Sequence, residues 1–337
     1  MRAAIVGTGF MGWIHYLAYR HCQNADLVGF ASRSEKKRSG DWSDVKGNFG
    51  PPGEVIPVGN LNVCESLTGL LDDDSIDLID ICLPPDLHAD VTVQCLNAGK
   101  SVLVEKPLAL HSDQAQKVAD AAATSAGNVY VAHILPFLPQ FRFLFDGFRE
   151  QRWGKCLGGR FKRIIGPPDW IDNFYVRDEV GGPLVDLHVH DAHLIRMMFG
   201  MPNQCHTRRR NHPETGVPQL VDSAFAFDDE SLVVSATGGV IDQAARPFTH
   251  GFEAHFEHAC VQFEFSAYAN GQTAMIPLTV ISADGIQQPD LGDGDPVDAF
   301  IDEIDAVATA MSGGAVHPAL ELENAIDAIK ICEMQER

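Results

Sequence analysis

The sequence predicts an α/β protein in which an N-terminal doubly wound parallel sheet is followed by a C-terminal α+β domain with a large open, mostly antiparallel sheet. In the first part, short apolar runs alternate with longer amphipathic stretches, as in parallel strands joined by helices. After about residue 150, strand-like runs follow one another with little helix between them. The length of 337 residues suits two domains, which we place at residues 1–130 and 131–337. The terminal helix is free to pack back on the first domain.

The strands expected in the N-terminal domain are apolar runs, several of which end at Gly or Pro. They are residues 3–7, 26–32, 76–84, 101–107 and 128–134. Helices are expected at about 12–22, 87–98 and 112–125, the last beginning with Ser and Asp, which suit a helix start. Residues 40–62 are rich in Gly, Pro and Asn and predict a loop or insertion with one short strand.

The expected strands of the C-terminal domain alternate apolar and polar residues in several places. They fall within residues 156–166, 223–229, 231–239, 252–265 and 272–280, and the tail reads as helix at 296–311 and 318–334. So few helices leave one sheet face uncovered, and an uncovered apolar face usually marks an interface. We therefore expect a homodimer or a homotetramer packed through that sheet.

The composition excludes several classes of partner. The formal net charge of −21 repels phosphate backbones and anionic lipid surfaces, so we expect neither nucleic acid nor membrane as a partner. No apolar stretch approaches the roughly 18 residues of a membrane span. The eight cysteines form no C-x-x-C pair, which favours free thiols in a reducing compartment. The chain opens directly into a strand with no preceding signal sequence, so cytoplasm is the expected location.

A glycine-rich turn joins the first expected strand to the first expected helix. Its residues form a G-x-G-x-x-G run, Gly7-Thr8-Gly9-Phe10-Met11-Gly12. The first glycine permits a tight turn, the second lets the backbone approach a pyrophosphate, and the third lets helix and strand pack closely. The helix N-terminus then offers free N–H groups to phosphates. This context predicts a dinucleotide-binding Rossmann domain rather than an ordinary strand–helix turn.

The end of the second expected strand indicates which dinucleotide binds. NAD enzymes usually keep a carboxylate about 20 residues beyond the glycine loop for the ribose hydroxyls. Here the sequence has Ser32 and Arg33 instead, a small hydroxyl and an arginine that suit a 2′-phosphate. We therefore expect NADP in preference to NAD. The basic residues 36–38 that follow also fit a solvated helix start.

Three segments carry a recognisable pattern: GTGFMGWIH at 7–15, LPPDLHADVTVQCLNAGKSVLVEKP at 83–107, and GGPLVDLHVHDAHLI at 181–195. Together they resemble the Gfo/Idh/MocA oxidoreductase family, the group that contains glucose–fructose oxidoreductase and inositol dehydrogenase. The resemblance runs from residue 1 to about 200. It implies a Rossmann domain, then an open sheet that lines the substrate site. It also implies hydride transfer between a nicotinamide and a sugar, polyol or related hydroxyl compound.

The resemblance also implies roles for single residues. Lys106 of the Glu105-Lys106-Pro107 motif would contact both cofactor and substrate hydroxyl, with Glu105 beside the cofactor. Asp186 and His190 would face the same substrate carbon, and these two with Lys106 are the expected catalytic residues. The remaining expected cofactor contacts border the nicotinamide dinucleotide: Leu83, Pro84 and His88. Two departures from the family pattern are Pro136, within residues 132–141, and Pro183, where a glycine is frequent.

The chemistry of these residue types fits oxidation of a secondary alcohol. A lysine at the carboxyl end of a strand lies where open α/β sheets bind ligands, and its cation stabilises a developing alkoxide. Histidine exchanges a proton near neutral pH. If residues 186–198 are helical, the i, i+4 spacing puts Asp186 and His190 on one face, where the carboxylate orients the imidazole.

Two other functions stay open at this stage. Members of the family that keep the nucleotide bound use it transiently in hydrolysis or epimerisation, and a non-catalytic nucleotide-binding sensor needs only the phosphate loop. A metal site formed by His188, His190 and His193 is disfavoured, because His188 points elsewhere on a helix, and we assign no metal ligands. The histidines of residues 250–258 receive no role.

Overall fold

The computed structural model of the chain describes residues 1–47, 49–167, 173–242, 245–292 and 294–336. These fall into two compact units. The first comprises residues 1–138 and 293–326, and the second residues 139–292 and 327–337. Compact units need not coincide with independent domains, so the expected division at residue 130 stays a prediction.

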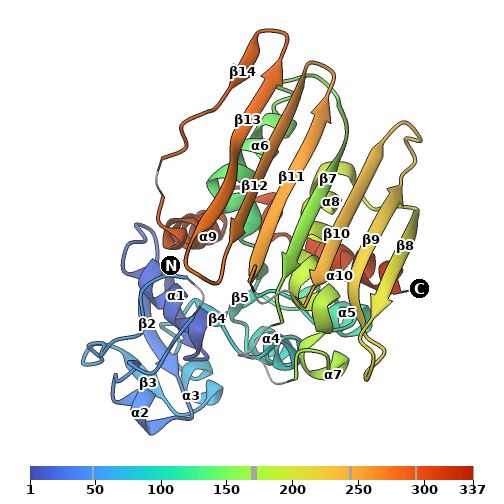
Figure 1. Cartoon of the computed structure of the whole chain (residues 1–337). Helices are drawn as coiled ribbons and strands as arrows, with labels where there is room; N and C mark the ends of the chain where they lie inside the picture. Colours follow the sequence, from blue (N-terminus) through green and yellow to red (C-terminus); the bar gives the residue numbers. More distant parts are fainter. Residues whose placement is uncertain (48, 168–172, 243–244, 293, 337) are drawn as a thin grey trace. The chain divides into compact units, whose positions relative to one another are not determined.

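The first unit is built on a six-stranded sheet with the order β3-β2-β1-β4-β5-β6 (Figure 1). Its strands are β1 (Arg2–Val6), β2 (Asp26–Ala31), β3 (Asn62–Cys64), β4 (Leu78–Ile81), β5 (Ser101–Glu105) and β6 (Val129–Ala132). Neighbouring strands pair in parallel, and β1, β4 and β5 are almost wholly buried. This is the expected doubly wound sheet. Its order reverses between β1 and β4, the point where such sheets bind ligands.

Helices connect these strands and one returns from late in the chain. They are α1 (Phe10–Tyr19), α2 (Glu35–Arg38), α3 (Leu67–Leu71), α4 (His88–Asn97), α5 (Ser112–Ala122) and α9 (Pro296–Met311). Helix α9 packs on α1. Three short 3-10 turns also belong to this unit: η1 (Pro85–Leu87), η2 (Leu135–Phe137) and η4 (Pro318–Leu320).

The expected loop of residues 40–62 is anchored by aromatic residues. The buried Trp42 packs edge-on against Trp13 of α1, with ring centroids 6.3 Å apart, and its indole N–H donates to the carbonyl of Lys37. The indole of Trp13 in turn donates to the carbonyl of Pro51 at 2.9 Å. The loop is therefore held against α1, directly behind the glycine-rich turn.

The second unit is built on an eight-stranded sheet with the order β14-β13-β12-β11-β7-β10-β9-β8. Its strands are β7 (Cys156–Ile165), β8 (Gln204–Asn211), β9 (Pro218–Ala226), β10 (Val233–Val240), β11 (Phe248–Phe256), β12 (Ala259–Ala267), β13 (Thr273–Ser282) and β14 (Gly285–Gln287). Strands β7 and β10 pair in parallel and the other neighbours are antiparallel. The predicted mostly antiparallel sheet is confirmed.

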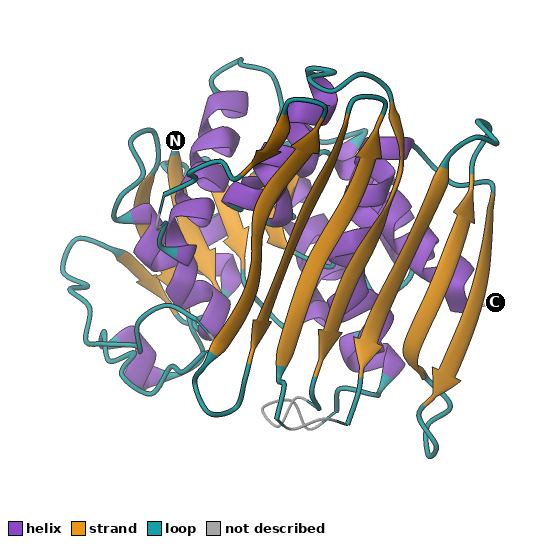
Figure 2. Ribbon diagram, turned by 45° about the horizontal axis from the view of Figure 1, so that its top comes forward, coloured by secondary structure: helices purple, strands orange, loops and turns teal. Residues whose placement is uncertain are grey.

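Helices of this unit pack against one face of the sheet. They are α6 (Pro139–Arg149), α7 (Arg177–Val180), the π-helical turn η3 (Pro183–His188), α8 (Val189–Phe199) and α10 (Leu322–Glu336), which the two units share. On that face Phe141 of α6 contacts the rings of Phe252 and Phe263. Figure 2 looks onto the opposite face, which these helices leave open.

The open face is more polar than we expected. Its exposed residues include the polar Arg160, His206, Arg208 and Asp222, beside the apolar Val233, Ile281 and Ile286. A shallow groove of about 660 Å³ runs over β7–β10 and is lined mainly by charged and hydroxyl side chains. The face is thus mixed in character, with polar residues that are compatible with solvent and exposed apolar residues among them, and assembly through this sheet stays a prediction.

Several elements differ from the sequence prediction. Strand β8 and helix α6 were not anticipated, and the helix expected from residue 186 is a π-helical turn followed by α8 from Val189. Pro183 and Leu184 begin that turn, so Asp186 lies inside it and His190 lies one residue into α8. Within the described residues, no helix has the length and apolarity that crossing a membrane requires.

Candidate functional site

The glycine-rich turn has the geometry of a phosphate loop. Gly7 has φ +104°, and a Cβ there would collide with the carbonyl of Cys82 at the end of β4. A Cβ on Gly12 would collide with the carbonyl of Gly7, so helix α1 starts in direct contact with the turn. At Gly9 a Cβ would meet nothing within 4 Å, which leaves open space in front of the start of α1. The loop therefore fits a pyrophosphate at the helix N-terminus.

Ser32 is held against this loop. Its hydroxyl oxygen lies 2.8 Å from that of Thr8, and the side chain is nearly buried at the end of β2. Arg33 follows it and is exposed. Within the part of the chain that the structure describes, no hydrogen bond or ion pair engages the Arg33 guanidinium. The two residues thus provide a hydroxyl near the loop and an available cation, a combination suited to a ribose 2′-phosphate.

The three basic residues after Arg33 are engaged within the protein. Lys37 is buried and forms an ion pair with Asp44, and Lys36 lies 3.7 Å from carboxylate oxygens of Asp41 and Asp44. Arg38 donates to the carbonyls of Ser32 and Arg33, each at 2.9 Å. Residues from the 40–62 loop therefore neutralise both lysines. Arg38 instead fixes the backbone on which Arg33 is carried.

The expected nicotinamide border lies at the carboxyl end of β4. Leu83 and Pro84 follow the strand, and the backbone of Leu83 is close to Gly7. His88 has a different position from the one expected of a cofactor contact, because its side chain is fully buried. Its Nδ1 lies 2.7 Å from the carbonyl oxygen of Pro107, and its Nε2 lies 2.7 Å from that of Leu83. His88 therefore ties the loop after β4 to the segment after β5.

Burial lowers the pKa of His88, against the opposing effect of the two carbonyl groups that its nitrogens meet. A neutral imidazole donates from only one nitrogen, whereas two carbonyl acceptors call for two donors. The contacts and the burial thus favour opposite protonation states. In either protonation state the ring donates to at least one of the two carbonyls, and so holds at least one of the two segments.

Glu105 ends β5 and its carboxylate points into the protein. One oxygen accepts from the backbone N–H of Lys106 at 3.1 Å, and the other lies 3.1 Å from Nε2 of the buried His15. Nδ1 of His15 lies 2.8 Å from a carboxylate oxygen of Asp80 in β4. Glu105, expected beside the cofactor, is thus engaged in a buried chain Asp80–His15–Glu105, and Lys106 is half-buried directly after it.

The charges of this buried chain perturb one another. Burial is the largest single influence on the pKa of His15 and would lower it, but the Asp80 carboxylate and the Cys82 side chain together outweigh burial, so that the pKa is raised well above its usual value. Glu303 of α9 is fully buried nearby, and neither of its carboxylate oxygens has a hydrogen-bond partner among the described residues. Burial, reinforced by the charge of Glu105, raises the pKa of Glu303 well above its usual value. We infer an imidazolium at His15 and a neutral carboxyl at Glu303.

In the second unit, Asp186 and His190 are both half-buried at the junction of η3 and α8. The helix beneath them is fixed by buried polar contacts. Arg163 of β7 binds the Asp191 carboxylate at 2.9 and 3.3 Å. Burial would raise the pKa of Asp191, but Arg163 and His188 outweigh it and lower that pKa. His190 therefore lies between the buried His188 and the buried Asp191, whose contacts hold this part of the helix in place.

The two neighbouring histidines are directed into the protein interior. His188 and His193 are fully buried. Nε2 of His188 lies 3.1 Å from the amide nitrogen of Gln335, and its ring packs where a Cβ on Gly238 would collide with it. Two groups of possible metal ligands occur among the described residues, and neither contains His188, His190 or His193.

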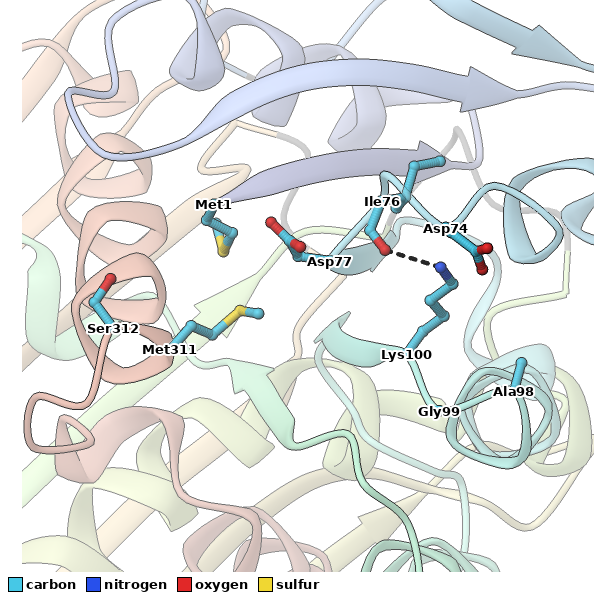
Figure 3. A pocket seen from close by; sticks show the side chains of 9 residues that line it. All are labelled: Met1, Asp74, Ile76, Asp77, Ala98, Gly99, Lys100, Met311 and Ser312. Carbon is cyan, nitrogen blue, oxygen red and sulfur yellow. Dashed lines mark hydrogen bonds between the residues drawn. The ribbon is translucent and has the colours of Figure 1, made fainter.

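A pocket of about 580 Å³ lies at the opposite edge of the parallel sheet from the glycine loop (Figure 3). Met1, Ile76 and Lys100 line it at the amino ends of β1, β4 and β5, where Lys100 donates to the carbonyls of Asp73 and Ile76. Open α/β sheets bind their ligands at the carboxyl ends. The location therefore separates this pocket from the dinucleotide site.

Sequence reasoning missed His15, Asp80, Glu303 and Arg163. One signal was available for Asp80, since a carboxylate inside the apolar run IDLIDICLP is rarely buried without a partner. His15 lies within the segment GTGFMGWIH that carries the resemblance, but a histidine on an apolar helix is usually structural. Glu303 and Arg163 gave no signal, because each lies in a segment whose pattern also fits exposure.

Comparison with known proteins confirms the fold and the class of activity. Residues 1–133 match the model of an oxidoreductase family with an NAD-binding Rossmann fold. Inositol 2-dehydrogenase of Rhizobium meliloti is 22% identical over 322 residues, which cover 94% of this chain and 90% of that protein. D-xylose 1-dehydrogenase (NADP(+)) 2 of Haloferax volcanii is 22% identical over 339 residues, covering 98% of this chain and 94% of that protein.

Solved structures share the whole architecture. Levoglucosan dehydrogenase in complex with NADH and levoglucosan has a TM-score of 0.77 at 19% identity, covering 100% of this chain and 96% of that one. Aldose-aldose oxidoreductase from Caulobacter crescentus, complexed with glycerol, has a TM-score of 0.79 at 15% identity, with 100% and 96% covered. At these identities the likeness shows a common fold.

Proposed function

Because the chain belongs to the Gfo/Idh/MocA family of NAD(P)-dependent oxidoreductases, we propose that it transfers a hydride between NADP and a hydroxyl-bearing carbon of a sugar or polyol. The observation that carries the proposal is the phosphate loop. The space in front of Gly9 is open, and it lies at the N-terminus of α1, where the strand order of the sheet reverses. The relatives inositol 2-dehydrogenase and D-xylose 1-dehydrogenase supply the substrate class.

In the proposed mechanism, a bound nicotinamide would supply or accept the hydride, while the chain's own residues stabilise charge and transfer the proton. Lys106 supplies a cation that stabilises negative charge on the reacting oxygen. His190 takes the hydroxyl proton during oxidation and returns it during reduction. Asp186 tunes the basicity of His190 as a neighbouring carboxylate. Glu105 and His88 act on Lys106 indirectly, since one accepts from its N–H and the other meets the carbonyl of Pro107.

The preference for NADP rests on Ser32 and Arg33. Lys36, Lys37 and Arg38 are occupied by carboxylates or carbonyls of the protein, so Arg33 is the basic side chain of this run left available for a phosphate. The guanidinium forks onto phosphate oxygens that NAD lacks. The family as a whole binds nicotinamide dinucleotides, and the choice between the two is our proposal.

A substrate screen tests the proposal directly. Purified protein is mixed with NADP or NAD and a panel of aldoses, polyols and inositols, and the absorbance of the reduced nicotinamide is followed. We expect formation of NADPH with at least one member, and a smaller rate with NAD. Reduction of the corresponding keto or lactone compounds with NADPH is measured in parallel, since it reveals an enzyme that runs mainly as a reductase.

The alternative function is a reaction in which the nucleotide stays bound and is regenerated within each turnover. Such an enzyme hydrolyses or epimerises its substrate without net change in free cofactor. Conversion of substrate without accumulating NADPH therefore supports the alternative, whereas a chain that binds cofactor but converts no compound supports a sensor. Lys106, Asp186 and His190 together favour an enzyme, because a sensor has no use for them.

Two further expectations belong to the same proposal. We propose a homodimer or homotetramer in which the open sheet face forms contacts through its polar and charged side chains. We also propose a cytoplasmic location, which the eight free thiols favour. Fractionation of cells that express the chain tests the second, and the first is taken up below.

A further inference from the structure

The open face of the second unit carries a cross-strand group of histidine, cysteine and glutamate. The three residues are Glu253 and His255 on β11 and Cys260 on β12. His255 and Cys260 are direct partners in the antiparallel register, close to the turn that joins the two strands. Glu253 lies two residues before His255, so all three side chains leave the same face of the sheet.

The distances between their donor atoms are short. One ligand atom from each residue lies within 4.8 Å of the other two, and Nε2 of His255 is 3.2 Å from Oε1 of Glu253. A tetrahedral zinc ion with bonds of about 2.0–2.3 Å holds its ligand atoms roughly 3.5 Å apart. The side chains of Glu253 and His255 are 47% and 46% exposed, so small rotations bring the three donors to that spacing.

Neighbouring residues leave room for an ion. The residue paired with His255 on the other side is Gly158 of β7, which has no side chain to fill the space. Glu253 is flanked in register by Arg160 and Gln262, and it forms an ion pair with His255. Imidazole, thiolate and carboxylate together are a donor set that suits zinc, whereas calcium and magnesium take oxygen ligands.

We propose that Glu253, His255 and Cys260 bind one zinc-class divalent cation on the open face of the eight-stranded sheet. The site lies on other strands and carries none of the residues proposed for hydride transfer, so it is independent of the proposed function. Three protein ligands leave a fourth position for water or for a donor from a second copy of the chain. The ion links β11 to β12 next to the turn that joins them, and its binding stabilises the folded chain.

Binding requires loss of the Cys260 proton. Burial and the charge of Glu253 raise the pKa of this thiol, so zinc must displace a proton to form the thiolate bond. The adjacent carboxylate stabilises the bound cation while it disfavours the free thiolate.

The test uses the full chain, stripped with a chelator and then titrated with Zn²⁺ against a chromophoric competitor, or with Co²⁺. We expect one ion per chain and a thiolate-to-cobalt charge-transfer band. Cys260→Ser abolishes the band, and both Cys260→Ser and His255→Gln weaken zinc binding at least about tenfold, the loss seen even for outer-shell partners. Zinc raises the melting temperature of the wild type but of neither variant.

Two control variants separate this site from other thiols. Cys205→Ser changes another half-buried cysteine of the same sheet and leaves binding unchanged. Cys82→Ser addresses the second possible ligand group, His15–Asp80–Cys82, whose histidine is already bonded to two carboxylates, and it also leaves the band intact. NADPH binding persists in Cys260→Ser. Absence of the cobalt band in the wild type, or equal zinc affinity in wild type and Cys260→Ser, overturns the proposal.

Discussion

His15 binds Glu105 across the interior of the first unit, with Nε2 of the imidazole 3.1 Å from Oε1 of the carboxylate. The same ring meets Asp80 through its other nitrogen, so one imidazolium separates two buried carboxylates. Because the second oxygen of Glu105 accepts from the N–H of Lys106, this contact reaches the proposed catalytic lysine through a single residue. We regard His15 as a positioning residue for Lys106.

Replacing His15 by Gln removes the cation from this group. Removing one partner of a buried ion pair typically costs about 3–5 kcal/mol, because the remaining charge is left uncompensated. We expect a loss of this size in the free energy of unfolding by urea. His21→Gln, a change at an exposed histidine just beyond α1, serves as the control and changes stability little.

The same substitution separates positioning from stability. At a temperature where the variant is fully folded, we expect kcat to fall more than KM changes, since a displaced Lys106 stabilises the transition state less. A wild-type kcat in folded His15→Gln contradicts the positioning role while leaving the stability prediction intact.

Stability should fall as the pH rises through the alkaline range. The pKa of His15 is raised well above its usual value in the folded chain, because the Asp80 carboxylate and the Cys82 side chain together outweigh the opposing effect of burial. The stabilisation is therefore complete below the unfolded value of about 6.5 and is lost as the pH rises through the folded value. Other titratable groups face the His15–Asp80 pair and shift the pH range over which this stability is lost; they are Tyr19, Cys82, Glu105 and Glu303.

Melting temperatures between pH 6 and pH 10 check this prediction against His15→Gln. Burial raises the pKa of the Cys82 thiol in the folded chain, which adds a pH dependence of its own on the alkaline side, so the slope is compared after Cys82→Ser in both backgrounds. A slope that His15→Gln leaves unchanged assigns the pH dependence to other groups.

Arg33→Ala should weaken NADP binding and leave NAD binding nearly unchanged. The guanidinium forks onto the 2′-phosphate, and a charge-assisted contact of this kind contributes about 1.5–3 kcal/mol, or roughly 10–150-fold in Kd. Fluorescence titration with NADPH and NADH measures both. Lys36→Ala is the matched control, because Lys36 is already occupied by Asp41 and Asp44. Equal losses of affinity for both cofactors, or a wild type that prefers NAD, would contradict the assignment of Arg33 to the 2′-phosphate of NADP.

Lys106→Met and His190→Ala should each reduce turnover strongly while NADPH still binds. Loss of an electrostatic stabiliser costs about 10²–10³-fold, and loss of a general base about 10²–10⁴-fold. Asp186→Asn is expected to be milder and to shift the pH profile of kcat. The double variant at 106 and 190 should lose less than the product of the single losses. If His190→Ala keeps near wild-type turnover, His190 is not the base.

Assembly through the open face predicts a charge-dependent oligomer. Arg160, Arg208 and Asp222 lie on this face, so their contacts weaken as salt is added. Arg160→Glu should shift the mass in solution toward the monomer, measured by light scattering at several salt concentrations. A monomeric wild type at micromolar concentration refutes the prediction, and an oligomer that ignores Arg160→Glu places the interface elsewhere.

The sequence was informative where a local rule determined the structure. Apolar runs ending at Gly or Pro predicted β1, β4 and β5, and the glycine spacing predicted the turn before α1. It was less informative where tertiary contacts decide. Strand β8 contains the polar run TRRRN, which lacks the apolar alternation that predicts a strand because β8 lies at the edge of the sheet and is mostly exposed. The π-helical turn at Pro183–His188 also escaped prediction, since i, i+4 spacing does not distinguish it from an α-helix.

The candidate site divides in the same way. Ser32, Arg33 and Lys106 could be singled out because they follow strands whose ends are readable from the sequence. The Asp80–His15–Glu105 chain joins residues 65 and 90 positions apart along the chain, and no local pattern encodes such a contact. Their partnership depends on parallel pairing of β1, β4 and β5, which only the folded sheet establishes.

The tryptophan pair behind the phosphate loop gives the molecule an internal optical probe. Trp13 directly follows Gly12, and the buried Trp42 packs against it. Indole emission overlaps the absorption of a reduced nicotinamide, so excitation of these rings transfers energy to NADPH seated at the loop. Binding of the cofactor to the unlabelled chain can therefore be measured as sensitised emission of the cofactor. A variant that displaces the 40–62 loop from α1 should change that signal, and this can be measured before any substrate is known.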